Sequence, residues 1–198
     1  MSTVAKYHSC DCSRRYDNMD DEPRQRVKIL KDLRGLLDQM GSSKVTLIGD
    51  IMLDRYYHGY SNRLISTAPV PVLKIQRSEE SPGAAAHIAR GLGSLGLNVS
   101  IFSCVGDDRE GEVIKNQFLS DGLPIDGIET VPGRQTLTKI RFFGSRQSLL
   151  DKSQILLQAD RESLEELDVG VSNRLVDKTL ESIPDSCALV ISDYDKGV

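Results

Sequence analysis

Two aspartates follow the first strongly apolar segment of the chain. Val45–Ile48 is a run rich in β-branched residues that stops at Gly49, and Asp50 and Asp54 come after it. Such a run predicts a strand buried on both faces of a parallel sheet. Ligands of open α/β sheets bind beyond the carboxyl ends of the strands, and carboxylates accept hydrogen bonds from the hydroxyls of a polyol or sugar. The spacing equally allows that Asp50 caps a turn and that Asp54 is solvated.

A second segment carries almost no side-chain bulk. Pro82 and Gly83 predict a turn, and the alanine-rich residues Ala84–Leu95 predict a helix. Small residues let the backbone approach a ligand closely, and the first N–H groups of a helix are free to donate. His87, about one turn into this helix, would lie near the same ligand. Tight packing of a helix on a sheet selects glycine and alanine too, so both interpretations stay open.

The rest of the chain alternates between strand and helix patterns. Strands are predicted at residues 99–105, 125–131, 136–143, 155–159 and 188–191, and helices at residues 110–119 and 171–183. Ser163 and Glu166 fit a capping box for the second of these helices. This alternation predicts the α/β class, with parallel strands joined by right-handed crossovers.

The segment Val70–Gln76 differs from these strands because it contains Pro71. Proline cannot donate a ladder hydrogen bond, so the segment is predicted to be an edge strand. Such a strand could serve as a lid over the site or pair with a second subunit. An ordinary edge hairpin explains the pattern equally well.

The N-terminal segment differs in composition from the rest. Residues 1–21 are polar and aperiodic, which predicts a disordered tail before a domain formed by residues 22–198. In the tail, His8, Cys10 and Cys12 lack a second ligand pair at finger-like spacing, so no metal site is predicted.

Charge and hydropathy exclude some classes of function. The net charge of −4 gives no electrostatic reason to expect binding to nucleic acid or to an anionic membrane surface. No apolar stretch is long enough to span a bilayer, and the N-terminus has no apolar region of the kind that secretory signals carry. The expected location is the cytoplasm.

Five motifs together resemble one family. They are Gly49–Tyr56, Ala68–Val72, Pro82–Ala86, Thr138–Arg141 and Ser192–Gly197. From about Leu30 to Val198 the chain resembles the N-terminal part of ribokinase-like (PfkB-type) sugar kinases. Among these it is most similar to the heptose 7-phosphate kinases that feed ADP-heptose synthesis for lipopolysaccharide.

The resemblance implies a fold and a reaction. The fold is a Rossmann-like α/β core, a mostly parallel sheet flanked by helices. A small β lid completes it, with strands within about 55–80 and 125–160. The reaction is the transfer of phosphate from ATP, with Mg²⁺, to a hydroxyl of a sugar phosphate, which requires a carboxylate base and donors for the developing charge.

The resemblance also implies roles for individual residues. Asp54 would bind sugar hydroxyls, and Gly83 with its neighbours would bring backbone to the sugar. Lys139 and Arg141 would contact the sugar phosphate, and Lys196 would lie near the active-site cleft.

The chain departs from the family in two respects. The family usually has Gly-Gly-Ala-Ala-Asn where this chain has Gly83 to His87. A methyl group at Ala84 crowds the backbone approach, and the imidazole of His87 replaces an amide, so both residues bear on the affinity for the sugar. The family's catalytic aspartate lies in a Gly-Ala-Gly-Asp turn that does not occur in the 198 residues. No catalytic residue is therefore assigned, and the chain is expected to stop before the ATP-binding half and to be inactive alone.

Two alternatives follow from these departures. The chain could be a non-catalytic module that binds a sugar, or that uses its lid to form a homodimer or to pair with a full-length kinase. It could also be one part of a kinase whose gene is split or misassigned.

Overall fold

The computed structural model describes residues 21–41, 43–145, 153–163 and 165–198. The predicted tail therefore lies outside the described residues except for Asp21, as do His8, Cys10 and Cys12. The chain divides into two units, Met1–Gly41 and Ser42–Val198. The first contains helix α2, Asp21–Met40. No helix in the described part of the chain is long and apolar enough to cross a membrane.

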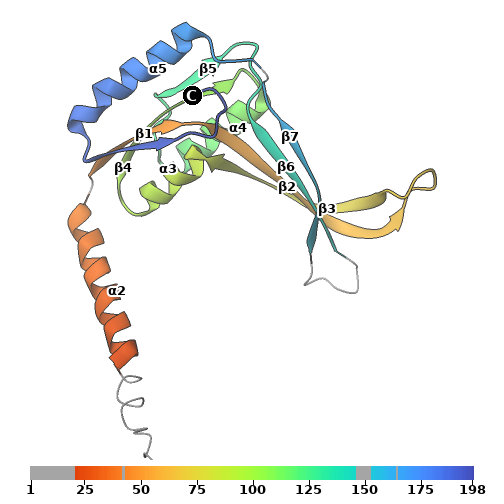
Figure 1. Ribbon diagram of the computed structural model, residues 1–198, viewed down its shortest axis with the longest axis horizontal. Coiled ribbons are helices and arrows are strands. Elements are labelled where there is room, and N and C mark those ends of the chain that lie inside the picture. The colour runs from red at the N-terminus through yellow and green to blue at the C-terminus, as the bar shows by residue number, and fades with distance from the viewer. Residues whose placement is uncertain (1–20, 42, 146–152, 164) are drawn as a thin grey trace, which may run out of the picture. The chain divides into compact units, whose positions relative to one another are not determined.

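Four parallel strands form the first sheet of the second unit, in the order β5-β4-β1-β8 (Figure 1). Their bounds are Lys44–Gly49 for β1, Asn98–Gly106 for β4, Ile128–Val131 for β5 and Ala188–Ser192 for β8. β1 is central, and its residues Val45, Thr46 and Leu47 are buried. The buried strand predicted at Val45–Ile48 is confirmed.

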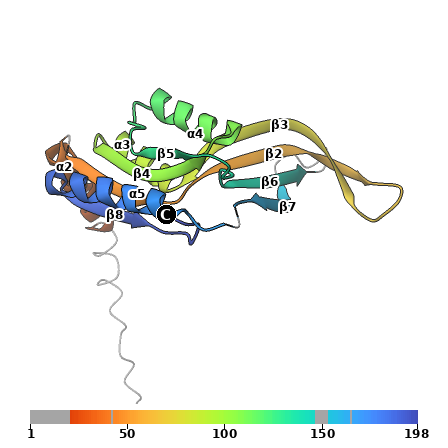
Figure 2. The ribbon, with the colours of Figure 1, turned by 90° about the horizontal axis from the view of Figure 1, so that it is seen from above.

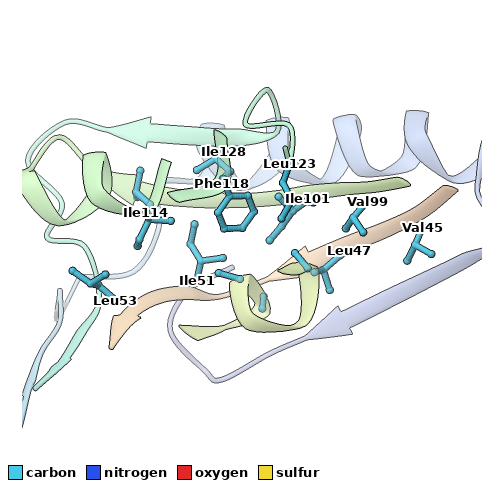
Figure 3. Packing of buried hydrophobic residues seen from close by; sticks show 14 of the residues in the cluster. Val45, Leu47, Ile51, Leu53, Val99, Ile101, Ile114, Phe118, Leu123 and Ile128 are labelled. Atoms are coloured by element: carbon cyan, nitrogen blue, oxygen red, sulfur yellow. The ribbon is translucent and has the colours of Figure 1, made fainter. Parts of the chain in front are cut away.

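Helices cover both faces of this sheet. α3 (Ala85–Ser94) and α4 (Arg109–Ser120) pack on one face, and α5 (Val169–Ser182), followed by the short 3₁₀ helix η1 (Ile183–Asp185), packs on the other. Figure 3 shows how side chains of α4 meet those of the central strands in the larger core. Its fully buried members include Leu47, Ile114 and Phe118, and each such side chain contributes about 1.5–3 kcal/mol through burial.

A second sheet has the order β3-β2-β6-β7 and mixes pairing directions. The bounds are Ile51–Leu64 for β2, Pro71–Ala84 for β3, Thr138–Ser145 for β6 and Gln154–Arg161 for β7. β2 is antiparallel to β3 and parallel to β6, and β6 is antiparallel to β7. The β2–β3 hairpin extends well beyond β6 and β7 (Figure 2). Only Asp50 separates β1 from β2, so one short junction joins the core sheet to the second sheet.

The predicted turn at Pro82 and Gly83 is wrong. Both residues belong to β3, where they pair with Leu53 and Met52 of β2. β3 is an edge strand, so proline is tolerated where its missing N–H faces away from β2.

The predicted capping box before α5 is also wrong. α5 begins at Val169, and its cap is Asp168, whose carboxylate accepts hydrogen bonds from the N–H groups of Gly170 at 2.8 Å and Val171 at 3.4 Å. The hydroxyl oxygen of Ser163 instead accepts from the N–H of Glu165 at 3.4 Å. The helix starts at Val169, two residues before the predicted residue 171, and Asp168 rather than Ser163 adjoins its first turn.

Candidate functional site

Asp50 occupies the junction between β1 and β2 and is 1% exposed. Its Oδ2 accepts hydrogen bonds from the N–H groups of Tyr194 at 2.8 Å and Lys196 at 3.2 Å, and its Oδ1 accepts from Val198 at 3.2 Å. The carboxylate therefore anchors the segment that follows β8. Of the two interpretations left open for Asp50, the structure favours a structural role, in which it holds a segment distant in sequence.

Asp54 lies four residues further on, in β2, beside β6. The parallel register pairs Asp54 with Lys139 and Tyr56 with Arg141. The Nη1 of Arg141 donates to the Oδ1 of Asp54 at 2.6 Å and to the hydroxyl oxygen of Tyr56 at 3.3 Å. The Arg141 guanidinium also lies 5.5 Å from the centre of the Tyr56 ring, within reach of a cation–π contact. Arg141 is thus fixed at the middle of this face.

The charges on this face are partly compensated. Burial lowers the pKa of the Arg141 guanidinium, but its hydrogen bond to Asp54 and the attraction of Asp54, Tyr56 and Asp160 together outweigh this, and the pKa ends above its ordinary value. Lys139 is half-buried on the same face and pairs in register with Asp160 of β7. No hydrogen bond or ion pair joins the Lys139 amine to another residue in the described ranges. Two cationic groups, Lys139 and Arg141, and the carboxylates of Asp54 and Asp160 therefore share one face of the second sheet.

The end of β3 lies against Asp54. A Cβ placed on Gly83 would lie 2.2 Å from the Oδ2 of Asp54, so any other residue there would have to displace the carboxylate that Arg141 holds. Ala84 follows with φ +53° and ψ −128°, a backbone conformation that favours glycine and costs an alanine on the order of 1–3 kcal/mol. The N–H of Ala85 then donates to the carbonyl of Asp50 at 3.0 Å as α3 begins. The chain turns sharply from β3 into α3 beside the carboxylate.

His87 and Lys196 make their contacts with other residues. His87 is exposed on α3 and lines a hollow of about 470 Å³ with Arg90 and Asp121, whose lining includes neither Asp54 nor Gly83. The Nζ of Lys196 pairs with Glu162 at 2.9 Å, which raises the pKa of the lysine. The sequence-predicted residues brought together are thus Asp54, Gly83, Ala84, Lys139 and Arg141.

The opposite face of the second sheet carries an ion-pair network. Arg55 donates to Glu80 at 2.7 Å and to Glu110 at 2.8 Å, and Arg109 donates to both oxygens of Glu80 at 3.1 and 3.2 Å. Burial raises the pKa of Glu80, but its hydrogen bonds to Arg109 and Arg55 outweigh this and hold the pKa below its ordinary value. The network ties β2 and β3 to the first turn of α4.

Sequence reasoning missed two residues that hold Arg141. Tyr56 lies two positions after Asp54 and so on the same face of β2. Gln158 of β7 accepts a hydrogen bond from the Nε of Arg141 at 3.2 Å. Tyr56 could have been found from the alternation of side chains along the strand that contains Asp54. Gln158 could not, because its contact depends on the register between β6 and β7.

A family model of the pfkB carbohydrate kinases matches residues 42–178. The bifunctional protein HldE of Hyphomonas neptunium is 36% identical over 166 residues, which are 84% of this chain and 33% of that protein. The chain therefore spans about a third of the length of such relatives.

Solved structures show the same fold. Phosphofructokinase-2 from Escherichia coli, in its tetrameric inhibited form, has a TM-score of 0.55 at 19% identity, covering 79% of this chain and 47% of that one. Arabidopsis thaliana ribokinase, complexed with ribose and ATP, has a TM-score of 0.52 at 15% identity, covering 76% of this chain and 45% of that one.

Proposed function

Because the chain belongs to the pfkB family of carbohydrate kinases, we propose that it forms the sugar-binding part of a kinase that phosphorylates a sugar phosphate. The substrate we propose is a heptose 7-phosphate, in keeping with the resemblance described above and with the similarity to HldE. The product would then feed ADP-heptose synthesis for lipopolysaccharide, and the location would be the cytoplasm.

The observation that carries this proposal is the arrangement around Asp54. Its Oδ1 is bound by Arg141, and its Oδ2 lies against the backbone at Gly83. A carboxylate held in this way has lone pairs left to accept hydrogen bonds from sugar hydroxyls. Its 18% exposure leaves it open to a ligand.

Arg141 and Lys139 supply the positive charge that a phosphate group requires. The contacts described for Arg141 use its Nε and Nη1, which leaves the Nη2 hydrogens to bind an anion. Hydrogen bonds between charged groups are short and about twice as strong as neutral ones. We therefore place the sugar phosphate against Lys139 and Arg141, with the hydroxyls toward Asp54 and Gly83.

ATP and Mg²⁺ are the co-substrate and metal that the family resemblance implies. The described residues contain no group of three or more His, Cys, Asp and Glu side chains placed to hold a metal ion. We assign no ligand for Mg²⁺ to these residues and derive no step through it. The family's Gly-Ala-Gly-Asp turn is absent from the sequence, so we propose that the 198-residue chain binds the sugar phosphate but does not transfer phosphate alone.

A second candidate is a module that associates through its lid. The β2–β3 hairpin exposes several large apolar side chains, namely Leu64, Ile65, Val70 and Ile75. Such a surface suits a homodimer or a complex with a full-length kinase. A monomer at high concentration that also fails to bind a full-length homologue would contradict this candidate.

Calorimetry tests the main proposal. The chain is titrated with a heptose 7-phosphate, with the unphosphorylated heptose and with ATP–Mg²⁺. We expect binding of the sugar phosphate and about tenfold weaker binding after Lys139→Met, a loss of about 1.4 kcal/mol. Lys74→Met, at an exposed lysine of β3, is the matched control and should change nothing.

Two outcomes would count against the proposal. Equal affinity for the phosphorylated and unphosphorylated sugar would remove the role of Lys139 and Arg141. Sustained phosphorylation of the sugar phosphate by the chain alone would show that it is not an incomplete kinase.

A further inference from the structure

The carboxylate of Asp108 binds two distant parts of the chain. Asp108 precedes α4, and its Oδ1 accepts a hydrogen bond from the N–H of Gly111 at 2.9 Å, as the carboxylate of a helix cap does. The same carboxylate also binds Thr136. Its Oδ1 accepts from the hydroxyl of Thr136 at 2.6 Å, and its Oδ2 accepts from the N–H of Thr136 at 2.9 Å. Asp108 therefore joins α4 to the segment that leads into β6.

These contacts hold the Asp108 carboxyl in its ionised form. Burial raises its pKa, but the hydrogen bonds from Thr136 and Gly111 and the attraction of Arg161 together outweigh this and keep the pKa below its ordinary value. An ionised carboxylate only accepts hydrogen bonds, which suits the N–H and O–H donors of Thr136. Hydrogen bonds to a charged acceptor are about twice as strong as neutral ones.

The end of β4 encloses Thr136, which is 2% exposed. The hydroxyl oxygen of Thr136 accepts a hydrogen bond from the N–H of Gly106, the last residue of β4, at 2.8 Å. A Cβ placed on Gly106 would lie 2.1 Å from the carbonyl oxygen of Arg134, so the backbone of residues 134–136 passes directly against the end of β4. Thr136 is thus held by the core sheet and by α4 together.

β6 begins directly after this contact. The carbonyl of Leu137 accepts a hydrogen bond from the N–H of Leu53 in β2 at 2.8 Å. Thr138, which is 1% exposed, then pairs with Leu53 in the parallel register of β2 and β6. Lys139 comes next in the chain. The position of Thr136 therefore determines which residues of β6 lie beside which residues of β2.

The register of β6 decides which face carries its cations. Successive side chains of a strand point to opposite faces, so a slip of one residue would move Lys139 and Arg141 away from the face that carries Asp54. The aromatic residues of β6 do not prevent such a slip, because Phe142 and Phe143 are adjacent and a slipped strand would still present a phenylalanine on each face. A fixed acceptor before the strand does prevent it, because it binds the N–H and hydroxyl of one particular residue.

We propose that Asp108 is a positioning residue for recognition of the substrate phosphate. Through Thr136 it fixes the residue at which β6 begins, and it thereby keeps Lys139 and Arg141 on the face that carries Asp54. This inference rests on the function proposed above, because it assumes that these two cations bind the phosphate. The role requires no contact between Asp108 and the substrate.

Asp168 provides a matched control. Its carboxylate caps α5 through the N–H groups of Gly170 and Val171, as that of Asp108 caps α4. Within the part of the chain that the structure describes, the hydrogen bonds of the Asp168 side chain stay at the start of its own helix. A role limited to capping would therefore give Asp108→Asn and Asp168→Asn the same consequences.

Hydrogen exchange of the chain without ligand tests the positioning. In Asp108→Asn the side-chain nitrogen cannot accept a hydrogen bond, so one of the bonds from Thr136 is lost. We expect exchange across Thr138–Phe143 to become about tenfold faster in this variant and to change by less than about twofold in Asp168→Asn. Thr136→Val should also speed exchange, whereas Thr136→Ser keeps the hydroxyl and should not. Circular dichroism should show that each variant is folded.

Calorimetry with heptose 7-phosphate connects the positioning to binding. Asp108→Asn should weaken binding about tenfold, as Lys139→Met does in the unmodified chain. In the Asp108→Asn background the lysine is already misplaced, so adding Lys139→Met should weaken binding by less than about threefold more. In the Asp168→Asn background the full effect of Lys139→Met should remain. A purely structural role of Asp108 would leave that effect unchanged in both backgrounds.

Two results would overturn the proposal. The first is equal exchange across β6 in Asp108→Asn and Asp168→Asn, and the second is an additive effect of Asp108→Asn and Lys139→Met on affinity. A different result identifies failure of the proposed function. If the unmodified chain does not bind heptose 7-phosphate, that function is wrong, and faster exchange in Asp108→Asn would still show that Asp108 sets the position of β6.

Discussion

The two faces of the second sheet use the same kinds of side chain in opposite ways. Asp54 and Arg55 are neighbours in β2, and each forms an ion pair, but on opposite faces. Asp54 meets Arg141 on the face that also carries Lys139, whereas Arg55 is enclosed between Glu80 and Glu110.

The difference lies in how completely each charge is satisfied. Arg55 has two carboxylate partners from two other elements, and its side chain is 13% exposed. Among the described residues, Arg141 has one carboxylate partner, Asp54, and its hydrogen bonds use Nε and Nη1 but not Nη2. We infer that the Arg55 face fixes the second sheet against α4, while the Asp54 face is left open for a ligand. This division predicts which substitutions change stability and which change binding.

We call the face that carries Arg55 the closed face and the face that carries Asp54 the open face. The largest expected effect of a substitution is on the closed face. Arg55→Ala would leave Glu110 largely buried with only longer pairs, to Arg161 at 3.7 Å and to Arg109 at 3.9 Å among the described residues, and should lower the free energy of unfolding by about 3 kcal/mol. Arg77→Ala removes an exposed pair with Glu79 at 2.9 Å and should cost less than about 1 kcal/mol. Urea unfolding followed by circular dichroism measures both. Similar losses for the two variants would show that the closed face has no special role.

On the open face, Asp54→Asn should mainly change binding. The amide keeps the shape but removes the charge that holds Arg141, so affinity for the sugar phosphate should fall about 30-fold, or about 2 kcal/mol. The free energy of unfolding should change by less than about 1 kcal/mol. Calorimetry and urea unfolding on the same sample separate the two quantities. A variant that binds normally but unfolds easily would reverse the assignment of the faces.

Ala84→Gly should stabilise the chain. Glycine adopts φ +53° without the steric penalty of an alanine, so the free energy of unfolding should rise by about 1 kcal/mol. A matched control is Ala86→Gly inside α3, where glycine should destabilise by about 1 kcal/mol or more. Thermal unfolding of the two variants should give shifts of opposite sign, and a loss of stability in both would show that Ala84 is unstrained.

Acid should weaken the closed face. The pKa of Glu80 is lowered in the folded chain by Arg109 and Arg55 against the effect of burial, so its contribution is complete above the unfolded pKa of about 4.3. It should be lost as the pH falls from there through the folded pKa, by on the order of 1 kcal/mol.

Unfolding free energies measured at pH 7, 4 and 3 test this dependence. The decline with acid should be smaller in Arg55→Ala, because Glu80 has already lost one of its partners there. An equal decline in both proteins would remove Glu80 from the explanation.

Much of the core was predictable because its signals are local. Val45–Ile48 carries its own strand pattern, and the alternation of elements predicts parallel pairing. Asp54 was predictable as a candidate because it follows that strand. Its partner was not predictable from pattern alone, because the pair with Arg141 joins residues 87 positions apart through the register of β2 and β6.

The failures concern backbone geometry and long-range contacts. Pro82 and Gly83 have turn chemistry, yet an edge strand accommodates both. His87 belongs to the helix that was predicted to approach the ligand, but its position on α3 places it with Arg90 at an exposed hollow. Asp50 has the residue type and the place after a strand that are typical of a ligand-binding residue. Only the folded chain reveals the backbone groups that it binds.

The grip of Asp50 on the segment after β8 has a consequence for synthesis of the chain. Its partner Tyr194 lies 144 positions further along, and β8, one of the two neighbours of β1, is also translated late. When β1 leaves the ribosome, β8 has not yet been made. The N–H groups that will donate hydrogen bonds to Asp50, the residue after β1, have not been made either. The nascent domain must therefore leave one edge of β1 unpaired and the Asp50 carboxylate without these partners until the segment 144 positions later has been made. A chaperone would be most useful during this interval.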